Sequence, residues 1–332
     1  MLTGASPPSR TVPVTVVIVN FNGGATLPRC LACLAAQTSL PERIVLVDNA
    51  SDDGSLETAR VAIAARPELA GRTTIDAAGT NLGFAAGSNR GIAAAETEFV
   101  ALLNADAFPE PGWLAALVAA AAVHPECAAF GSRQMHAGQP GVLDGIGDHW
   151  HFSGLSWREG HGRAMRREDL EPREIFSPCA AAALYRRQAV LDVGGFDEDY
   201  FCFGEDVDLG YRLRLAGHRA RCVPDAVVEH VGGASTPGAA ATYFGHRNTL
   251  WTLVKNTPGP LLAPALLAHL SQSILVGIVL AARGREWAFV RAKWDAVRGL
   301  PGAWRKRRLV QAARKASAWQ VWRTIDVGWS RR

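Results

Sequence analysis

The chain has 332 residues, of which 48% are apolar and 20% are charged. This is the composition of a globular protein, and the 33 Gly and 18 Pro are too dispersed for a fibrous repeat. The length exceeds one typical core of about 100 to 200 residues, which predicts one large α/β unit with an appendage, or two domains. Collagen, a coiled coil and a protein with many membrane spans are excluded.

The net charge of +4 is unevenly distributed along the chain. Residues 283–332 hold 14 Lys or Arg and three Asp or Glu, a net charge of +11, so residues 1–282 carry −7. Six of the ten Trp also lie in this last segment. A basic and Trp-rich composition suits an anionic membrane surface or a nucleic acid.

Residues 1–11 are predicted to form a loose tail. Apolar, β-branched runs then recur at 14–19, 44–47, 73–75 and 99–103. Their spacing is close to the roughly 30 residues of a strand, helix and strand unit. Because Ala- and Leu-rich helical stretches separate them, they predict a mainly parallel, Rossmann-like sheet flanked by helices. Ligands of such sheets bind beyond the carboxyl ends of the strands.

Polar side chains stand where these runs end, at Asn20, Asn22, Asp48, Asn49, Asp53, Asn104 and Asp106. The GxGxxG turn of a dinucleotide-binding fold is absent after the first run, which disfavours a nicotinamide dehydrogenase. Carboxylates at this edge suit a ligand that offers N–H donors, hydroxyls and a metal ion, as a nucleotide-diphosphate sugar does. Asp48 can accept from a base, Asp53 can hold ribose or cap a helix, and Asp106 can ligate Mg²⁺ or Mn²⁺.

A second acidic cluster lies at 197–208, where carboxylates alternate with aromatic side chains. Helical spacing predicts that Glu205 and Asp206 open a helix, where acids also complement the helix dipole. A carboxylate beside the rings of Phe201 and Phe203 can have its pKa raised and act as a base. Residues 132–178 fit neither a strand nor a helix pattern, and they form either the acceptor side of the cleft or a variable surface excursion.

Taken in order, these segments resemble the inverting glycosyltransferases of family 2, which have the GT-A fold, and most closely their bacterial rhamnosyltransferase-like members. The resemblance covers residues 13–255 and rests on VVIVNFNG, VDNASDDGS, NLGFAAGSNRGI, LLNAD, GGFDEDYFCFGEDVDLGYRLRLAG and HRNTLW. It implies transfer of a sugar, with rhamnose suggested, from a UDP- or dTDP-linked donor. The acceptor would be a hydroxyl of a lipid-linked or polysaccharide molecule in cell-envelope glycan synthesis.

Position by position, the resemblance implies that Asp206 is the catalytic base, with Glu205 as the second choice. Asp106 matches the retained carboxylate of the metal-binding DxD motif, whose first carboxylate is missing because residues 104–106 read NAD. His230 matches an additional ligand of related enzymes, which gives Mg²⁺ or Mn²⁺ one carboxylate and one imidazole. The candidates for binding the nucleotide sugar are Asn20, Asn22, Asp48, Asn49, Asp53, Gly83, Phe84, Asn89, Asn104 and Arg247, whose fork suits phosphate.

A turn-rich boundary precedes residues 261–282, a stretch of 22 residues without formal charge. It is long enough to span a bilayer, but Pro, His and Gln interrupt it, so a span, an in-plane helix and a packed helix stay open. The body and the +11 segment are both expected on the cytoplasmic side of the membrane. A single membrane crossing between them would place them on opposite sides. We therefore predict peripheral attachment to the inner face of the cell membrane, through Trp287, Val290, Trp294 and Val297, with Arg291, Lys293 and Arg298 near headgroups.

The predicted organisation is a tail at 1–11, a GT-A domain at 12–255 and a helical, basic, Trp-rich, membrane-associated extension at 256–332. The missing DxD carboxylate favours an alternative function, a catalytically silent GT-A-like protein that binds glycans or acts as a membrane scaffold. A nucleotidyltransferase is disfavoured because its Gly-rich phosphate loop is absent. Nucleic-acid binding is disfavoured because the body already implies a sugar donor. Uracil and thymine offer Asp48 the same ring N–H, so the nucleotide stays open.

Overall fold

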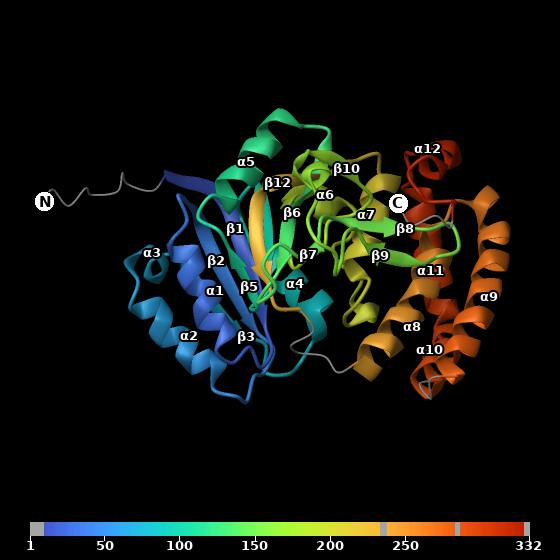
Figure 1. Cartoon of the computed structure of the whole chain (residues 1–332), viewed down its shortest axis with the longest axis horizontal. Helices are drawn as coiled ribbons and strands as arrows, with labels where there is room; N and C mark the ends of the chain where they lie inside the picture. Colours follow the sequence, from blue (N-terminus) through green and yellow to red (C-terminus); the bar gives the residue numbers. More distant parts are fainter. Residues whose placement is uncertain (1–9, 233–237, 283–285, 329–332) are drawn as a thin grey trace, which may run out of the picture.

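One large sheet organises the structure, a computed structural model that describes residues 10–232, 238–282 and 286–328 (Figure 1). Its parallel half comes from the four runs predicted as strands, β1 (Arg10–Asn20), β2 (Ser39–Asp48), β3 (Thr73–Ala77) and β4 (Phe99–Leu103). They pair in the order β3-β2-β1-β4, with Asn20 opposite Asp48. All of β4 is buried, as expected for a strand covered on both faces.

The other half makes the sheet mixed. Strand β11 (Ala182–Arg186) runs antiparallel to β4 and to β6 (Cys127–His136), whereas β12 (Arg219–His230) runs parallel to β6. The short strands β5 (Ala107–Pro109), β7 (Leu143–Gly145) and β10 (Arg173–Ile175) extend the sheet, and β8 (Asp148–Trp150) pairs separately with β9 (Ser156–Arg158). The segment 132–178, which has no regular sequence pattern, therefore contains short strands.

Helices cover both faces of the sheet. On one face lie α1 (Thr26–Ala35), α2 (Ser55–Ala64), α3 (Pro67–Ala70) and α5 (Trp113–Val123). On the other lie α4 (Gly83–Ala94), α6 (Arg187–Asp192) and α7 (Glu205–Leu215). Two 3-10 turns span Arg167–Leu170 and Glu198–Tyr200. Helix α4 lies close to β1 because Gly91 has no side chain, since a Cβ there would come within 2.2 Å of Val17.

The predicted loose tail at 1–11 extends too far. Arg10 and Thr11 already pair with β2, and the pairing register shifts around Pro13. A proline lacks the N–H that a strand ladder needs, so the sequence pattern placed the start of the strand after it. Residues 1–9 lie outside the described residues.

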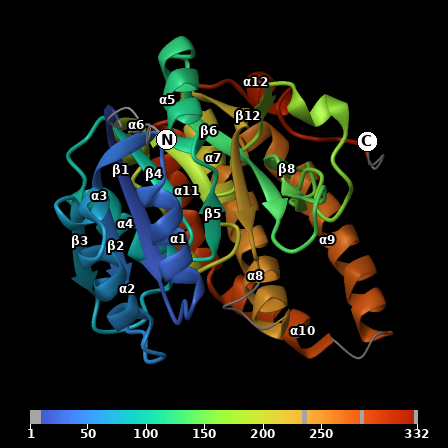
Figure 2. The same cartoon turned by 60° about the vertical axis from the view of Figure 1, so that its left-hand side comes forward.

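The C-terminal helices pack along one side of the sheet (Figures 1 and 2). They are α8 (Gly238–Asn256), α9 (Gly259–Ala281), α10 (Glu286–Arg298), α11 (Leu300–Ala312) and α12 (Ala318–Trp322). A common hydrophobic core joins them to the body, and it includes Trp150, Tyr211, Leu253, Ala265, Ala296, Ala303 and Val321. The division of the chain between residues 255 and 256 stays a prediction, and the packing runs across it.

Among the described helices, α9 alone has the length and composition to cross a membrane, and 22% of its most apolar stretch is buried. Its inner face docks on the loop after β8, where His269 Nδ1 lies 2.9 Å from the Ser153 carbonyl and Gln272 contacts the Ser153 hydroxyl. Lys293 was predicted near lipid headgroups. This is wrong, because its Nζ lies 3.0 Å from His269 Nε2 in the interface between α9 and α10.

Candidate active site

The loops after β1 and β2 are tied together by a set of hydrogen bonds that we call the loop network, formed by Asn20, Asp48, Ser51 and Ser55. The fully buried Asn20 donates through Nδ2 to Asp48 Oδ1 at 2.8 Å and to the two serine hydroxyls at 2.9 and 3.0 Å. The buried Asp48 also accepts from the Ser51 hydroxyl and N–H. Two predicted donor-binding residues thus shape this loop from within, and contact between Asp48 and a base stays a prediction.

Asn22 and Asp53 lie at the exposed rim of the same loops. Asn22 has a φ of +53°, an uncommon conformation for a residue other than glycine. Asp53 accepts hydrogen bonds from the N–H groups of Gly24 and Ser55 at 2.8 and 2.9 Å. Burial acts in the opposite direction, but these hydrogen bonds lower the pKa of Asp53. Asp53 therefore joins the two loops, and its contact with ribose stays a prediction.

The start of α4 meets these loops through Gly83. Its φ is +80°, and a Cβ there would lie 2.5 Å from the Phe201 carbonyl oxygen, so only glycine fits. The Gly83 carbonyl accepts from Asn49 Nδ2 at 3.0 Å. Asn49 and Gly83, both predicted to bind the donor, thereby connect the end of β2 with the segment that precedes α7.

Three predicted donor-binding residues point toward that segment instead of toward the strand ends. The Phe84 ring packs edge-on against Phe196, and Asn89 exchanges hydrogen bonds of 2.8 and 2.9 Å with the Phe196 backbone. Arg247 donates to the Tyr200 carbonyl at 2.9 Å. These contacts support the segment before α7, and a part of the three residues in donor binding stays a prediction. Motif position alone did not show which backbone groups would engage these side chains.

The two predicted metal ligands come together. Strand β12 pairs with β5 so that His230 lies opposite Ala107, and His230 Nε2 is 3.3 Å from Asp106 Oδ1. Its Nδ1 is 2.8 Å from Asp144 Oδ2. Burial would lower the pKa of His230, but the two carboxylates outweigh it and raise this pKa to about 9.

This donor set fits a divalent cation. A carboxylate oxygen of Asp106 and an imidazole nitrogen of His230 converge, and these are ligand types that Mn²⁺ accepts. Asp144 holds the other nitrogen, which is the arrangement that orients metal-ligating histidines. Asn104 replaces the first acid of the DxD motif with a neutral amide, and within the described chain this amide makes no hydrogen bond.

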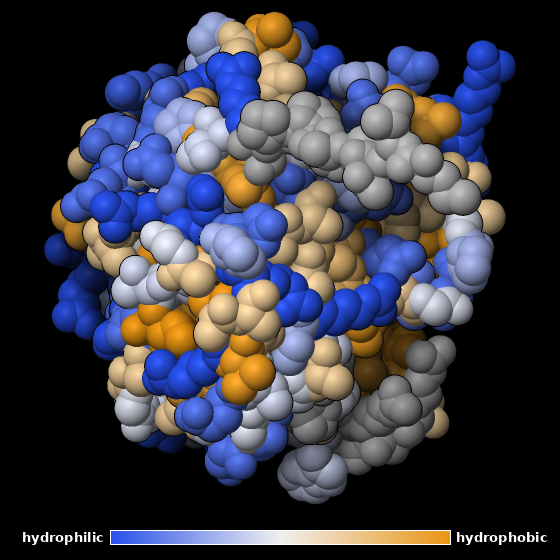
Figure 3. Space-filling model, turned by 90° about the vertical axis from the view of Figure 1, so that its left-hand side faces the viewer, coloured by the Kyte–Doolittle hydropathy of each residue, from blue (hydrophilic) through white to orange (hydrophobic). Residues whose placement is uncertain are grey.

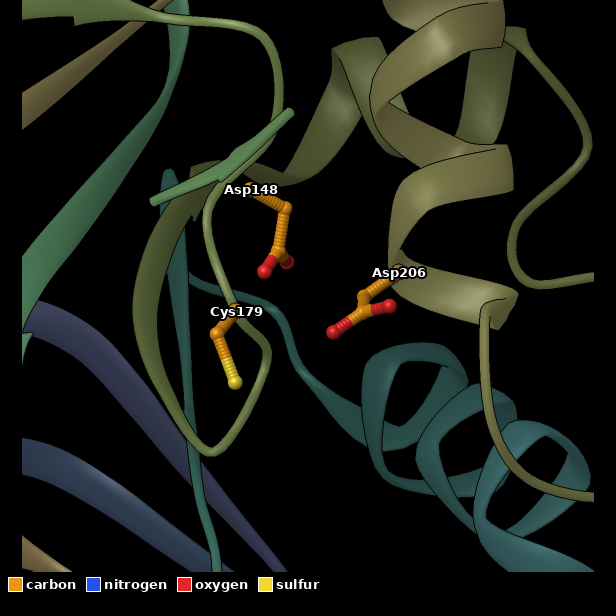
Figure 4. Close-up of side chains that lie close together, drawn as sticks. All are labelled: Asp148, Cys179 and Asp206. Atoms are coloured by element: carbon orange, nitrogen blue, oxygen red, sulfur yellow. The ribbon is translucent and has the colours of Figure 1, made fainter. Parts of the chain in front are cut away.

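Arg158 of β9 connects these groups to a second pair of carboxyls. Its Nη1 lies 2.5 Å from Asp144 Oδ2, and its Nε lies 3.7 Å from Asp148 Oδ1. Asp148 of β8 and Asp206 of α7 point into the same space (Figure 4), where an oxygen of each and the Cys179 sulfur lie within 4.8 Å of one another. We call the continuous series the charged network, formed by Asp106, His230, Asp144, Arg158, Asp148 and Asp206.

The cluster of Asp148, Cys179 and Asp206 is a poor metal site. Burial raises the pKa of the Cys179 thiol, and a protonated thiol is not a metal ligand. Burial and the Asp206 charge also raise the pKa of Asp148 to about 8. Asp106 and His230 are therefore the better candidates for a cation, which would have to displace the proton of the His230 imidazole in order to bind there.

Asp206 lies in the first turn of α7, directly after Glu205 as predicted, and its carboxylate accepts hydrogen bonds. Its Oδ1 accepts from the Val207 N–H at 2.8 Å, its Oδ2 from the Ala180 N–H at 3.2 Å, and the first helical turn favours negative charge. Glu205 is buried, and burial together with the Asp206 charge raises its pKa well above the usual range. Of the two candidates, Asp206 is the one that is half-exposed and whose carboxylate accepts hydrogen bonds from two backbone N–H groups.

The segment before α7 is strained and is held by a residue that the sequence analysis did not select. Phe201 and Phe203 have φ of +63° and +67°. Asn248 Nδ2 donates to the carbonyls of Tyr200, Cys202 and Phe203 at 3.1, 2.9 and 2.7 Å. Asn248 therefore fixes the backbone that presents Asp206. The only sequence signal for it was its place in HRNTLW.

Comparisons with known proteins show the family to which the chain belongs. The family model described as Glycosyl transferase family 2 matches residues 15–194, more than half of the chain. The chain is 34% identical over 277 residues to N-acetylglucosaminyl-diphospho-decaprenol L-rhamnosyltransferase of Mycobacterium tuberculosis, which covers 75% of this chain and 86% of that protein.

Two solved structures are similar in fold. Mannosyltransferase PcManGT from Pyrobaculum calidifontis, in complex with GDP-Man and Mn²⁺, matches with a TM-score of 0.54 and 18% identity, over 94% of this chain and 88% of that one. S. aureus TarS 1-349 in complex with UDP-GlcNAc matches with a TM-score of 0.55 and 18% identity, over 90% of each chain. The resemblance to the rhamnosyltransferase-like members and the GT-A fold are thus confirmed. The chain belongs to glycosyl transferase family 2 and is a glycosyltransferase.

Proposed function

We propose that this enzyme transfers a sugar, with rhamnose as the leading candidate, from a UDP- or dTDP-linked donor to a hydroxyl of a lipid-linked or polysaccharide acceptor in cell-envelope glycan synthesis. The observation that carries the proposal is the charged network, because it joins the candidate metal ligands to the candidate base. The name of the mycobacterial relative supports L-rhamnose and a GlcNAc-diphospho-lipid acceptor. The Mn²⁺ bound to PcManGT supports a divalent cation.

The residues divide into a donor side and a reacting side. The loops that carry Asn20, Asp48 and Asn49 would hold the nucleoside. Mg²⁺ or Mn²⁺ on Asp106 and His230 would neutralise charge on the leaving diphosphate. The Asp48 contact with the base and the Asp53 contact with ribose belong to this proposal.

Asp206 takes the proton from the acceptor hydroxyl as that oxygen bonds to the anomeric carbon. The bond between this carbon and the phosphate oxygen breaks, and the nucleoside diphosphate leaves with the electron pair. Attack opposite the leaving group inverts the anomeric centre. Each reaction therefore yields one glycoside, one nucleoside diphosphate and one proton on Asp206.

The experiment incubates the purified protein and Mn²⁺ with dTDP-rhamnose, UDP-GlcNAc or GDP-mannose, and with a polyprenyl-diphosphate-linked GlcNAc as acceptor. We expect transfer from one donor, which is suppressed by EDTA and lost in Asp206→Asn and Asp106→Ala. Donor binding without turnover in the unsubstituted protein would instead support the catalytically silent glycan-binding or scaffold protein.

We also propose that the C-terminal helices hold the enzyme on the cytoplasmic, inner face of the cell membrane. The outer face of α9 carries Leu267, Leu270, Ile274 and Ile278, which are 59% to 68% exposed. Exposed Trp287, Val290, Trp294 and Val297 form a stripe on α10, beside the exposed Arg291 and Arg298. Apolar and Trp side chains next to arginines suit the boundary between acyl chains and anionic headgroups. On the face seen in Figure 3, hydrophilic and hydrophobic residues are intermixed.

An in-plane α9 fits the contacts of its inner face better than a membrane span does. A span would withdraw His269 and Gln272 from Ser153 and would expose polar groups to lipid. An in-plane helix keeps these contacts and places only the apolar face in the membrane.

Sedimentation with vesicles tests this attachment. We expect the protein to bind phosphatidylglycerol/phosphatidylcholine vesicles more tightly than pure phosphatidylcholine vesicles. Replacing both Trp287 and Trp294 by Ala should weaken this binding, whereas Val61→Ala, at an equally exposed apolar position on α2, should not. Protein that stays in the supernatant with anionic vesicles would refute membrane attachment.

A further inference from the structure

The carboxyls of Asp148 and Asp206 are close but have different surroundings. Asp148 is fixed by its own backbone, since its N–H donates to the Ser177 carbonyl at 2.7 Å, and its side chain is 8% exposed. Asp206 reaches the same space from the start of α7 (Figure 4). Two carboxylates within 4.8 Å, one of them buried, repel each other strongly enough that the pair retains one proton.

The hydrogen bonds indicate which carboxyl keeps this proton. Asp206 accepts from two backbone N–H groups in the first turn of a helix, and each of these contacts favours its anion. The Asp148 carboxyl accepts no hydrogen bond from any described residue. Arg158 Nε stands 3.7 Å away, and Nη1 of the same guanidinium is engaged with Asp144 at 2.5 Å. Asp148 is therefore the less stabilised anion of the two.

We propose that Asp148 is a positioning residue of the transfer reaction: it holds the single proton of the carboxyl pair and so keeps Asp206 as the anion that receives the acceptor's proton. This inference rests on the proposed role of Asp206 as the base. It gives a function to the short β8-β9 hairpin, which carries both Asp148 and Arg158 into the site. It also explains why a carboxyl without a hydrogen-bond donor lies in this buried position.

The other titratable or charged groups that face the pair do not supply a competing proton near neutral pH. Burial keeps the Cys179 thiol, the Tyr185 phenol and the Glu205 carboxyl protonated by raising the pKa of each. Among the described residues, three charged or titratable groups remain. Asp144 pairs with Arg158, and His149 pairs with Glu159.

The proposal predicts a pH effect with a definite sign. Because burial and the Asp206 charge raise the pKa of Asp148 to about 8, a second negative charge appears beside the base above that pH. This charge would lie next to the carboxylate that receives the acceptor's proton and would oppose the approach of an anionic donor, so kcat/KM should fall as pH rises through this range.

Asp148→Asn tests this, since Asn stays neutral at every pH. We expect the fall near pH 8 to disappear, the acid limb of the profile to stay in place, and kcat at pH 7 to drop by less than about tenfold, well below the general-base contribution. Cys179→Ser, which changes the same space without removing a carboxyl, should retain the fall. Thermal unfolding and donor affinity of each variant report whether its fold is intact.

Two kinetic outcomes would overturn the proposal. If Asp148 is an anion in the resting enzyme, its removal lowers the pKa of Asp206 and moves the acid limb toward lower pH. If Asp148 is itself the base, Asp148→Asn loses as much activity as Asp206→Asn.

Infrared difference spectroscopy separates this proposal from the proposed function, because it needs no turnover. Between about pH 6 and about pH 10 the wild type should lose a carbonyl band of a neutral carboxylic acid that Asp148→Asn lacks. An inactive protein that shows this band would refute the transfer reaction but leave the proton on Asp148. An active protein whose spectra match those of Asp148→Asn would overturn the role of Asp148.

Discussion

The loop network and the charged network lie at the same edge of one sheet but satisfy their polar groups differently. In the loop network a single amide nitrogen, Nδ2 of Asn20, donates to one carboxylate and two hydroxyls, and one of these hydroxyls, that of Ser51, also donates to the carboxylate of Asp48. The charged network contains four acids but only one Arg and one His, and the Asp148 carboxyl accepts no hydrogen bond from the described chain. Hydrogen bonds within the protein stabilise a fold, whereas buried charges that are incompletely paired cost stability and are typical of reactive sites.

The largest effect should come from the reacting end of the charged network. Asp206→Asn removes the base but keeps an oxygen that can accept from the Val207 or Ala180 N–H. We expect kcat to fall by about 10² to 10⁴, the usual contribution of a positioned base, with little change in Tm. Initial rates and thermal unfolding measure the two. A variant with more than a tenth of wild-type activity would remove Asp206 from the mechanism.

The next largest effect should come from Asp144, which supports the candidate metal ligand His230. Asp144→Asn weakens the hold on His230 Nδ1, so the affinity for Mn²⁺ should fall by about 10- to 100-fold, as for other outer partners of metal-ligating histidines. Calorimetric titration with Mn²⁺ measures this directly.

Asp169→Asn provides the matched control for that titration. Asp169 is a buried acid that pairs with Arg163 at 2.7 and 2.8 Å, outside the charged network. This variant should lose stability but not Mn²⁺ affinity. Equal losses of affinity in the two variants would mean that Asp144 acts only through the fold.

A substitution in the loop network should lower the stability of the fold, in contrast to the substitutions in the charged network. Asn20→Ala leaves Asp48, Ser51 and Ser55 without their shared donor, so we expect the free energy of unfolding to drop by about 1 to 3 kcal/mol. Urea denaturation measures this loss. The donor KM should also rise, because these loops carry the proposed nucleoside contacts. An unchanged unfolding free energy would show that the two networks do not differ as described.

This contrast also explains what the sequence could predict. The runs at 14–19, 44–47, 73–75 and 99–103 identified β1 to β4, because a buried parallel strand needs a short apolar segment. Since parallel strands end at one edge, the polar residues after them were found together. The pair of Asp106 and His230 came from the family resemblance.

The rest of the charged network was not readable from the sequence. Asp144, Asp148 and Arg158 lie on strands of three residues within 132–178, and such short strands carry no measurable periodicity. Their partners are set by how β7, β8 and β9 pack against β12 and α7. For the same reason the sequence did not show that Asn89 and Arg247 bond to backbone groups before α7.

The smallest effect should come from Asp53, the exposed carboxylate beside the loop network. Hydrogen bonds from Gly24 and Ser55 lower its pKa in the folded protein. A depressed pKa contributes stability above the unfolded pKa of about 3.9, and this contribution is lost as pH falls through the folded pKa. Asp53→Asn should therefore lower the unfolding free energy at pH 7 by less than about 1 kcal/mol, because the group is exposed.

The stability gap between wild type and Asp53→Asn should close as the pH falls below about 4, which urea denaturation across acid pH measures. Asp52→Asn is the matched control, because the Asp52 side chain makes no hydrogen bond to the described chain and its variant should show no such gap. A gap for Asp53→Asn that stays constant into acid would mean that the amide fits the loop poorly. In that case the charge of Asp53 would contribute nothing to the free energy of unfolding. Charge effects would then be confined to the charged network, which would sharpen the contrast between the two networks.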